Sequence, residues 1–141
     1  MNNFDSCQIC KLVALKPTGL SRAMHNAGFE AKNLNFKYEV LDTSDTALAV
    51  GEMREQGIRG YSLTIPHKEA ALDLIDEIDS AAKEVGAVNT VVNDNQILTG
   101  YNTDVYGVEQ ALIEVSSVAE FGTVLIPVSY THLTLPTICS V

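Results

Sequence analysis

The spacing of apolar and polar residues along the chain predicts strands that alternate with helices. Short apolar or alternating runs predict strands over residues 9–15, 36–41 and 60–65. Helices are expected between them, over residues 21–31 and 46–56, where apolar residues recur at helical spacing. The first half of the chain therefore predicts a regular succession of strand and helix.

Polar residues and glycines mark where the helices are expected to begin and end. Ser21 is the expected cap of the first helix, and residues 43–45 offer caps for the second. Gly57 suits the C-terminal end of the second helix. Asp104 is the expected cap of a last helix that runs to about Val115.

The clearest helical pattern runs from Glu69 to Val85, with charged residues on the face opposite the apolar one. Residues 87–93 and 97–100 are then predicted to form a hairpin, because Asp94-Asn95 between them tolerates turn conformations. The apolar residues of the helical pattern are Ala71, Leu74, Ile75, Ile78, Ala82 and Val85.

This order of elements predicts the fold class. Strands that alternate with helices favour a three-layer α/β/α domain with a mostly parallel sheet. The end of the chain differs, because residues 121–141 contain no Asp, Glu, Lys or Arg. Residues 123–126 predict one further strand, and the segment after Pro127 has no helical periodicity.

The length and net charge of the chain limit the kinds of partner that it is expected to bind. At 141 residues the chain is about one domain long, and its net charge of −9 disfavours nucleic acid and anionic membranes as partners. An anionic substrate would need a local cationic or hydrogen-bonding site. The sequence has no basic leader before an apolar run and no apolar stretch of membrane-spanning length, so a cytoplasmic protein is expected.

The cysteines give a weak signal. Cys7 and Cys10 form a C-x-x-C without a second pair or a nearby His, and they fall in a predicted strand. Two reduced core thiols are expected there, and no metal site.

Polar residues gather at the predicted ends of elements. Ser21 lies at a helix start, where free N–H groups can hold a carboxylate. Lys68 follows a strand in "TIPHK", and a Lys in a partly closed cleft can move the proton of a substrate hydroxyl. Asn89 and Asp104 could bind hydroxyls, and a carboxylate beside Lys68 would hold its ammonium. For each residue alone, a structural role as a cap, a solvated helix residue or a turn residue is the favoured explanation.

The shared position of these polar residues at the ends of elements favours a ligand-binding site. Ser21, Thr64, Lys68, Asn89 and Asp104 all fall at element ends, and the carboxyl ends of parallel strands share one edge of a sheet where ligands bind. Such a set could bind a small polyhydroxylated carboxylate.

Four segments in order resemble motifs of the shikimate dehydrogenases, including the quinate/shikimate branch. "GLSRAMHNAGF" is similar to the family's Ser-x-Ser-Pro-x-Met-His-Asn, and "GYSLTIPHKEAA" to its Asn-Val-Thr-x-Pro-x-Lys. "AKEVGAVNTVV" and "GYNTDVYG" are similar to its Gly-Ala-x-Asn-Thr and Asn-Thr-Asp-Gly segments. The resemblance covers roughly residues 19–112.

The resemblance implies an enzyme that reduces 3-dehydroshikimate to shikimate with NADP, in the pathway to chorismate and the aromatic amino acids. By this resemblance Lys68 would be the catalytic lysine that handles the hydroxyl proton, and Asp104 would be its carboxylate partner. Asn89 would bind ring hydroxyls, Ser21 the substrate carboxylate, and Thr64 the substrate nearby.

Some positions depart from the family pattern. Gly19 stands where the family has the first Ser of Ser-x-Ser, and Arg22 stands where it has Pro, so Arg22 either replaces a carboxylate ligand or is solvated. Tyr106 intervenes before Gly107 in the last motif. These departures affect substrate choice more than reaction class. His67, beside the lysine, is expected to be incidental.

The largest departure is in the cofactor domain. The family continues into a Rossmann domain with a Gly-rich loop, but no two of the nine Gly here are separated by a single residue. The sequence therefore predicts a shikimate dehydrogenase-like substrate-binding catalytic domain over 1–115 and the start of a truncated cofactor domain over 116–126. Residues 127–141 stay unassigned and look like translated adapter or cloning sequence.

Two other functions remain open at this point. A stand-alone binding module for a small hydroxylated carboxylate would need no Gly-rich loop, but it would also need no proton-transfer pair. A quinate-preferring dehydrogenase differs from a shikimate dehydrogenase only in the hydroxyl pattern of its substrate. The chain alone is expected to be inactive as a dehydrogenase.

Overall fold

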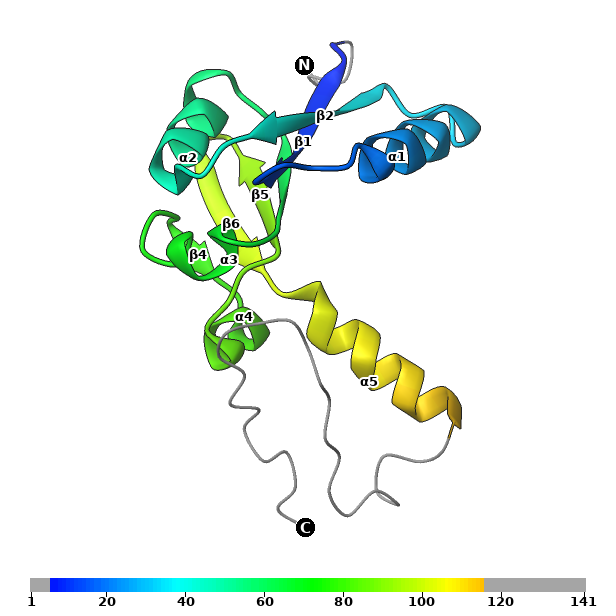
Figure 1. Ribbon diagram of the computed structural model, residues 1–141, viewed down its shortest axis with the longest axis vertical. Helices are drawn as coiled ribbons and strands as arrows, with labels where there is room; N and C mark the ends of the chain where they lie inside the picture. Colours follow the sequence, from blue (N-terminus) through cyan, green and yellow to red (C-terminus); the bar gives the residue numbers. More distant parts are fainter. Residues whose placement is uncertain (1–5, 116–141) are drawn as a thin grey trace.

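The computed structural model describes residues 6–115 of the chain as a mixed α/β domain (Figure 1). The sequence-based predictions for residues 116–141 lie outside this range. In chain order the elements are β1 (Gln8–Ala14), α1 (Leu20–Ala31), β2 (Phe36–Asp42), α2 (Thr46–Glu55), β3 (Gly60–Leu63), α3 (His67–Ala70), β4 (Glu77–Ile78), α4 (Ser80–Val85), β5 (Thr90–Asp94), β6 (Ile97–Tyr101) and α5 (Thr103–Val115).

The strands form one six-stranded sheet in the order β2-β1-β3-β5-β6-β4. β1 pairs in parallel with both β2 and β3, and β4 pairs in parallel with β6. The pairings β3–β5 and β5–β6 are antiparallel. Within the described residues three of the five strand pairings are parallel, so the sheet is mixed and mostly parallel, as predicted.

Helices lie on both faces of the sheet, as the alternation of strand and helix predicts. α2 covers one face, where Lys11 of β1 forms an ion pair with Glu52 of α2. α1 covers the other face along β2, where the ring of His25 stacks on that of Tyr38 at 4.2 Å. Figure 1 shows α1 and α2 on opposite sides, and α5 extending away from the sheet.

The hydrophobic core lies between the sheet and α2. Strand residues that point to this face alternate with residues of the opposite face, as in β3, where Tyr61 and Leu63 are buried. Leu74, Ile75 and Ile78 pack against the same cluster. The buried members are Val13, Ala49, Val50, Met53, Ile58, Tyr61, Leu63, Ala71, Ala82, Val88, Val91 and Leu98.

The long helix predicted over residues 69–85 is wrong. The structure has instead one turn of helix (α3), a series of turns, the short strand β4 and the helix α4. Asp79 caps α4, since its side chain accepts a hydrogen bond from the Ala82 amide at 2.8 Å. Asp76 accepts from the Leu98 amide and from the guanidinium of Arg54. The apolar residues are turned toward the core as the pattern predicts, but the two aspartates bind backbone and Arg54 in ways that end the helix.

The hairpin forms as predicted, although β5 begins at Thr90, three residues after the predicted start, and most other elements agree with the pattern to within one or two residues. β5 and β6 are joined at Asn95 and Gln96, which both have positive φ, as in the tight turns that connect such strands. Asp45 caps α2 by accepting from the Leu48 amide at 2.9 Å, and Gly57 follows α2 with a φ of 63°. No helix of the described residues is long and apolar enough to span a membrane.

The predicted caps of the first and last helices are wrong. Gly19, in the left-handed conformation, precedes α1, and Ser21 lies inside the first turn of that helix without capping it. At the last helix, the Asn102 side chain accepts hydrogen bonds from the amides of Asp104 and Val105, so Asn102 is the cap. Asp104 therefore lies in the first turn of α5.

Candidate functional site

The candidate residues meet at one edge of the sheet. β1 and β3 run in parallel, with Val13 opposite Leu63, so both strands end at this edge. β5 runs the other way and begins there, with Thr90 opposite Ser62 and opposite Tyr101 at the end of β6. The segments that follow or precede these strand ends are the loop before α1, the α3 turn, residues 86–89 and the start of α5. They carry the predicted site residues.

Lys68 and Asp104 form an ion pair at this edge. The Lys68 Nζ donates to Asp104 Oδ2 at 2.9 Å. The lysine side chain is only 12% exposed and the aspartate side chain 46% exposed. The ammonium is therefore largely withdrawn from water while the carboxylate faces outward, an arrangement in which a ligand can approach the pair from the solvent side.

The α3 turn that carries Lys68 is held by contacts to its neighbours. The Lys68 carbonyl accepts a hydrogen bond from the Val88 amide at 2.8 Å. The His67 amide donates to the Thr64 carbonyl, also at 2.8 Å, and Thr64 in turn is bound to the end of β1 through the Val13 carbonyl. These backbone bonds hold the turn against β1 and against the segment that precedes β5.

The same segment holds the helix that carries Asp104. The Asn102 amide group donates to the Ala87 carbonyl at 2.9 Å, while the Asn102 oxygen caps α5. Asn102 is buried, with 7% of its surface exposed. Residues 87 and 88 therefore hold both partners of the ion pair. Ala87 binds Asn102, which caps the helix of Asp104, and Val88 binds the Lys68 carbonyl.

Asn89 extends this link. Its side chain is buried, its oxygen accepts from the Thr103 amide at 3.1 Å and from the Thr90 hydroxyl at 2.9 Å, and its nitrogen donates to the Thr103 hydroxyl at 3.0 Å. Its backbone also pairs with Leu63 and Tyr101. Asn89 therefore orients the start of α5 directly before Asp104, in addition to any contact with a ligand.

Ser21 and Arg22 lie in the first turn of α1, which follows the end of β1 at the same edge. Ser21 is half-buried and Arg22 is exposed. Thr64 is half-buried and lies directly after β3. The structure thus brings all six predicted residues to one edge, and it places Lys68, Asp104 and Asn89 in one bonded network.

His67, Asn102 and Thr103 belong to the site, although the residue pattern did not single them out. His67 was expected to be incidental and is fully buried. Asn102 and Thr103 stand in the quoted segment "GYNTDVYG", directly before Asp104, and their polar side chains next to a predicted helix start were a signal for capping. Asn102 binds backbone groups on both sides of the ion pair, and the Thr103 hydroxyl binds the Asn89 side chain. The His67 ring binds the loop before α2 and the first residue of that helix.

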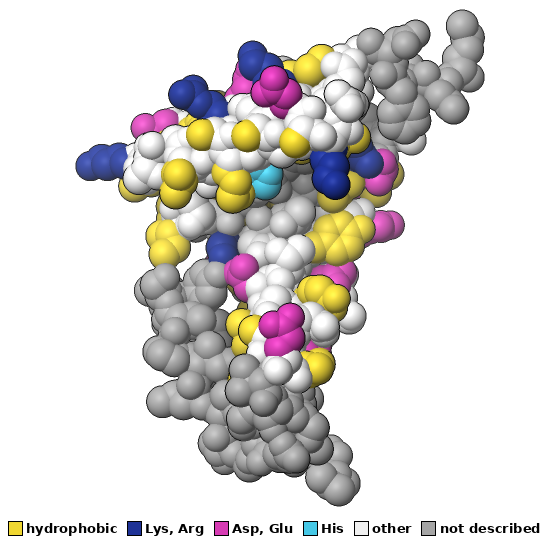
Figure 2. All heavy atoms as spheres, turned by 90° about the vertical axis from the view of Figure 1, so that its right-hand side faces the viewer, with side chains coloured by type: hydrophobic (Ala, Val, Ile, Leu, Met, Phe, Trp, Pro, Cys, Tyr) yellow, Lys and Arg dark blue, Asp and Glu magenta, His cyan; other side chains and the backbone are white. Residues whose placement is uncertain are grey.

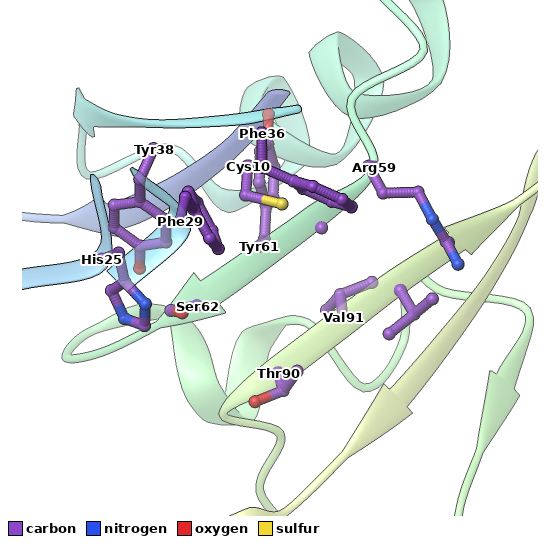
Figure 3. Close-up of a pocket in the computed structure, with 12 residues that line it drawn as sticks. Cys10, His25, Phe29, Phe36, Tyr38, Arg59, Tyr61, Ser62, Thr90 and Val91 are labelled. Carbon is purple, nitrogen blue, oxygen red and sulfur yellow. The ribbon is translucent and has the colours of Figure 1, made fainter. Parts of the chain in front are cut away.

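A pocket lies beside this edge, on the sheet face that α1 covers. Its volume is about 380 Å³, and Figure 3 shows His25, Phe29 and Tyr38 lining one side and Thr90 and Val91 another. α1 leaves apolar side chains in solvent on its outer side, where Leu20 and Met24 are 75% and 62% exposed. Figure 2 shows such hydrophobic side chains among charged ones on this side of the molecule.

Two titratable groups that line the pocket, the Cys10 thiol and the Tyr38 phenol, are held neutral. Burial raises the pKa of the Cys10 thiol, and the charge of Arg59 opposes only part of that rise. Burial likewise raises the pKa of the Tyr38 phenol, with a smaller opposing effect from Ser62. Cys10 is a free thiol, as expected, but it is only partly buried and lines the pocket. Cys7 is also a free thiol but is exposed, so it is not a core residue.

No group of three or more metal-binding side chains occurs among residues 6–115. The polar residues of the edge are instead suited to hydrogen bonding: one ammonium, one carboxylate, an amide and several hydroxyl groups. Such groups recognise hydroxyls and carboxylates.

Comparison with known proteins places this geometry in a family. Residues 17–91 match the model of the shikimate dehydrogenase substrate binding domain. The chain belongs to this family. The match extends from the loop before α1 to the beginning of β5 and so includes Lys68 and Asn89.

Curated relatives and solved structures agree with this assignment. The chain is 47% identical over 100 residues to a shikimate dehydrogenase (NADP(+)) of Bacillus cereus and 45% identical over 97 residues to one of Caldanaerobacter subterraneus. It is 36% identical to a Listeria monocytogenes shikimate 5-dehydrogenase that was solved with shikimate and NAD, with a TM-score of 0.71 over 77% of this chain and 38% of that one.

The chain spans about a third of the length of its curated relatives: the aligned part is 70% of this chain and 36% of the Bacillus cereus protein. The resemblance that the four motifs carried is thereby confirmed, and the family shows what kind of domain this is.

Proposed function

We propose that the described domain is the substrate-binding and catalytic part of an NADP-dependent shikimate dehydrogenase, which reduces 3-dehydroshikimate to shikimate. The observation that carries the proposal is the ion pair of a largely buried Lys68 with Asp104 at 2.9 Å, at a sheet edge rich in hydroxyl and amide groups. A domain that only binds a hydroxylated carboxylate has no need for a withdrawn ammonium of this kind.

In the proposed reaction Lys68 gives a proton to the substrate oxygen as the ketone is reduced, and takes it back in the reverse direction. A positioned general acid or base contributes on the order of 10²–10⁴-fold to a rate. Asp104 keeps the ammonium oriented and charged before transfer. The proton and the pair of electrons reach the substrate from different sources, since the lysine supplies only the proton.

The remaining residues would bind the substrate. Ser21, in the first turn of α1, and the neighbouring Arg22 are placed to hold a carboxylate, because the free amides of that turn and the hydroxyl group favour an anion. Thr64 and Asn89 flank the ion pair along the edge and would take ring hydroxyls. The Asn89 nitrogen carries a second hydrogen besides the one it donates to Thr103.

NADP would supply the hydride. The described residues do not offer a place for its phosphates: no Gly-x-Gly loop occurs in the sequence, and no strand is followed directly by a Gly-rich helix start. We therefore assign NADP to the part of the enzyme that corresponds to the remaining length of the relatives. Within this chain only the substrate half of the reaction can be tested.

The test is calorimetric titration of shikimate into the purified chain and into Lys68→Ala, with Lys83→Ala as the matched control. Lys83 is exposed in α4, so its loss changes the net charge equally without touching the edge. We expect Lys68→Ala to weaken shikimate binding at least tenfold and Lys83→Ala to leave it unchanged. Equal affinity in all three proteins would refute the assignment of Lys68.

Quinate serves as the comparison ligand in the same titration. It presents a carboxylate and ring hydroxyls in another pattern, so the ratio of the two affinities reports which hydroxyls the edge recognises. Tighter binding of quinate, still dependent on Lys68, would make this a quinate-preferring member of the same family and leave the roles of the residues in place.

A further inference from the structure

His67 is the buried histidine next to the proposed catalytic lysine, and its ring makes two hydrogen bonds. Its side chain is completely buried. The Nε2 atom lies 2.9 Å from the Thr43 carbonyl oxygen, and the Nδ1 atom lies 2.9 Å from the Thr46 hydroxyl. Both partners belong to one short stretch, the loop after β2 and the first residue of α2.

The chemistry of the partners assigns the hydrogen positions. A carbonyl oxygen only accepts, so Nε2 carries the hydrogen and donates it to Thr43. In that tautomer Nδ1 has a lone pair and accepts from the Thr46 hydroxyl. Each ring nitrogen thus has the one role that its partner allows, and the ring plane is fixed by two bonds on opposite sides.

The helix turn on which His67 stands needs such a support. α3 contains four residues, His67–Ala70, and one helical turn is too short to be stable by itself. Its backbone is bound to Thr64 and Val88, both on the sheet side. The His67 ring adds the connection to α2, in a direction that the backbone bonds do not cover. The orientation of the turn, and with it the direction of the Lys68 side chain, depends on both kinds of contact.

We propose that His67 is a positioning residue for Lys68: through Thr43 and Thr46 it fixes the α3 turn against the start of α2, so that the lysine ammonium meets Asp104. The proposal rests on the proposed function as far as catalysis is concerned. The effect on the geometry of Lys68 is a property of the domain itself and can be measured without a substrate.

The test compares variants at both ends of the hydrogen bond in the full 141-residue chain. His67→Phe fills a similar volume and removes both ring bonds, and Thr46→Val removes only the hydroxyl that the ring accepts from. Thr46→Ser keeps that hydroxyl and is the conservative control. Thr46 is itself buried, and a substitution there keeps the native side chains at positions 67 and 68.

The first readout is the reactivity of the Lys68 amine. Trace labelling with acetic anhydride, followed by mass spectrometry, gives the rate at Lys68 relative to exposed Lys83 in the same molecule. We expect a severalfold higher relative rate in His67→Phe and Thr46→Val, because an amine that leaves Asp104 becomes more accessible to the reagent than the 12% exposed side chain of the unaltered protein. Thr46→Ser should behave as the unaltered chain.

The second readouts are urea unfolding and shikimate titration. Loss of stability in His67→Phe with unchanged Lys68 labelling and unchanged shikimate affinity would overturn the proposal and leave His67 a structural residue only. If His67→Phe does not fold, Thr46→Val decides by the same criterion. Altered labelling in a chain that binds no shikimate would support the positioning role and refute the proposed function, so the two failures are distinguishable.

Discussion

Asn102 allows the structural account of the site to be tested quantitatively. Its side chain performs two separate tasks, because the oxygen caps α5 at the Asp104 and Val105 amides and the nitrogen donates to the Ala87 carbonyl. Replacement by Ala removes both. Loss of a helix cap costs about 1 kcal/mol, and a partly buried carbonyl that loses its donor costs about 1–2 kcal/mol. The expected loss in free energy of unfolding is therefore about 2–3 kcal/mol.

A second variant separates the two tasks. Asn102→Ser retains an oxygen that can cap the helix and lacks the amide that reaches Ala87. Its expected cost is therefore only the second part of the sum, about 1–2 kcal/mol. Urea unfolding followed by far-ultraviolet circular dichroism measures both variants against the unaltered chain, with the slope of the transition as the check on two-state behaviour.

Two outcomes would contradict this role of Asn102. A loss below about 0.5 kcal/mol in Asn102→Ala, which is within the range of ordinary surface substitutions, would mean that Asn102 does not join α5 to residue 87. Equal losses in the Ala and Ser variants would mean that the cap contributes nothing and that the bond to Ala87 accounts for the whole effect.

Further predictions concern the core and the acid side of the stability profile. In Gly100→Ala the added Cβ would overlap the Ile75 side chain and lie 2.9 Å from Val88, so we expect a loss of about 1–3 kcal/mol in urea unfolding. Gly107→Ala, with open space around it, should gain up to about 1 kcal/mol, and equal effects of the two substitutions would contradict the packing described. The Arg54 guanidinium holds the pKa of Asp76 below its ordinary value of 3.8, so the ionised form stabilises the fold above that pH and the contribution is lost as the pH falls below it. The stability difference between the unaltered chain and Asp76→Asn should therefore shrink below about pH 4, and a pH-independent difference would contradict it.

The sequence predicts the frame of this domain well because its apolar periodicity is strong. The strands, α1, α2, α5 and the hairpin follow from patterns in which each side chain is turned toward or away from the core. Residues 69–85 show the limit of this reasoning. Their apolar positions satisfy helical spacing and are indeed turned inward, but Asp76 and Asp79 bind backbone amides, and that competition between side chain and backbone is not visible in periodicity.

The sequence predicts which residues gather at the candidate site, but it does not predict the contacts that hold them in place. Lys68, Asp104 and Asn89 were found because their residue types suit proton transfer and hydroxyl binding and because they stand at element ends. The burial of His67 was not predicted, because a histidine beside a lysine in a helix start is usually solvated, and only the fold brings Thr43 and Thr46 to its ring. Contacts between segments that lie more than 20 residues apart have no local signature.

The hydrogen bonds that hold the two partners of the ion pair converge on a short segment, residues 87–88. Lys68 is held from the Val88 amide and Asp104 from Ala87 through Asn102, so a displacement of residues 87–88 moves both partners together. The His67 ring adds a support to one partner only. Substitutions at residues 87–88 should therefore change stability while the distance within the pair is kept, whereas substitutions at His67 should change that distance.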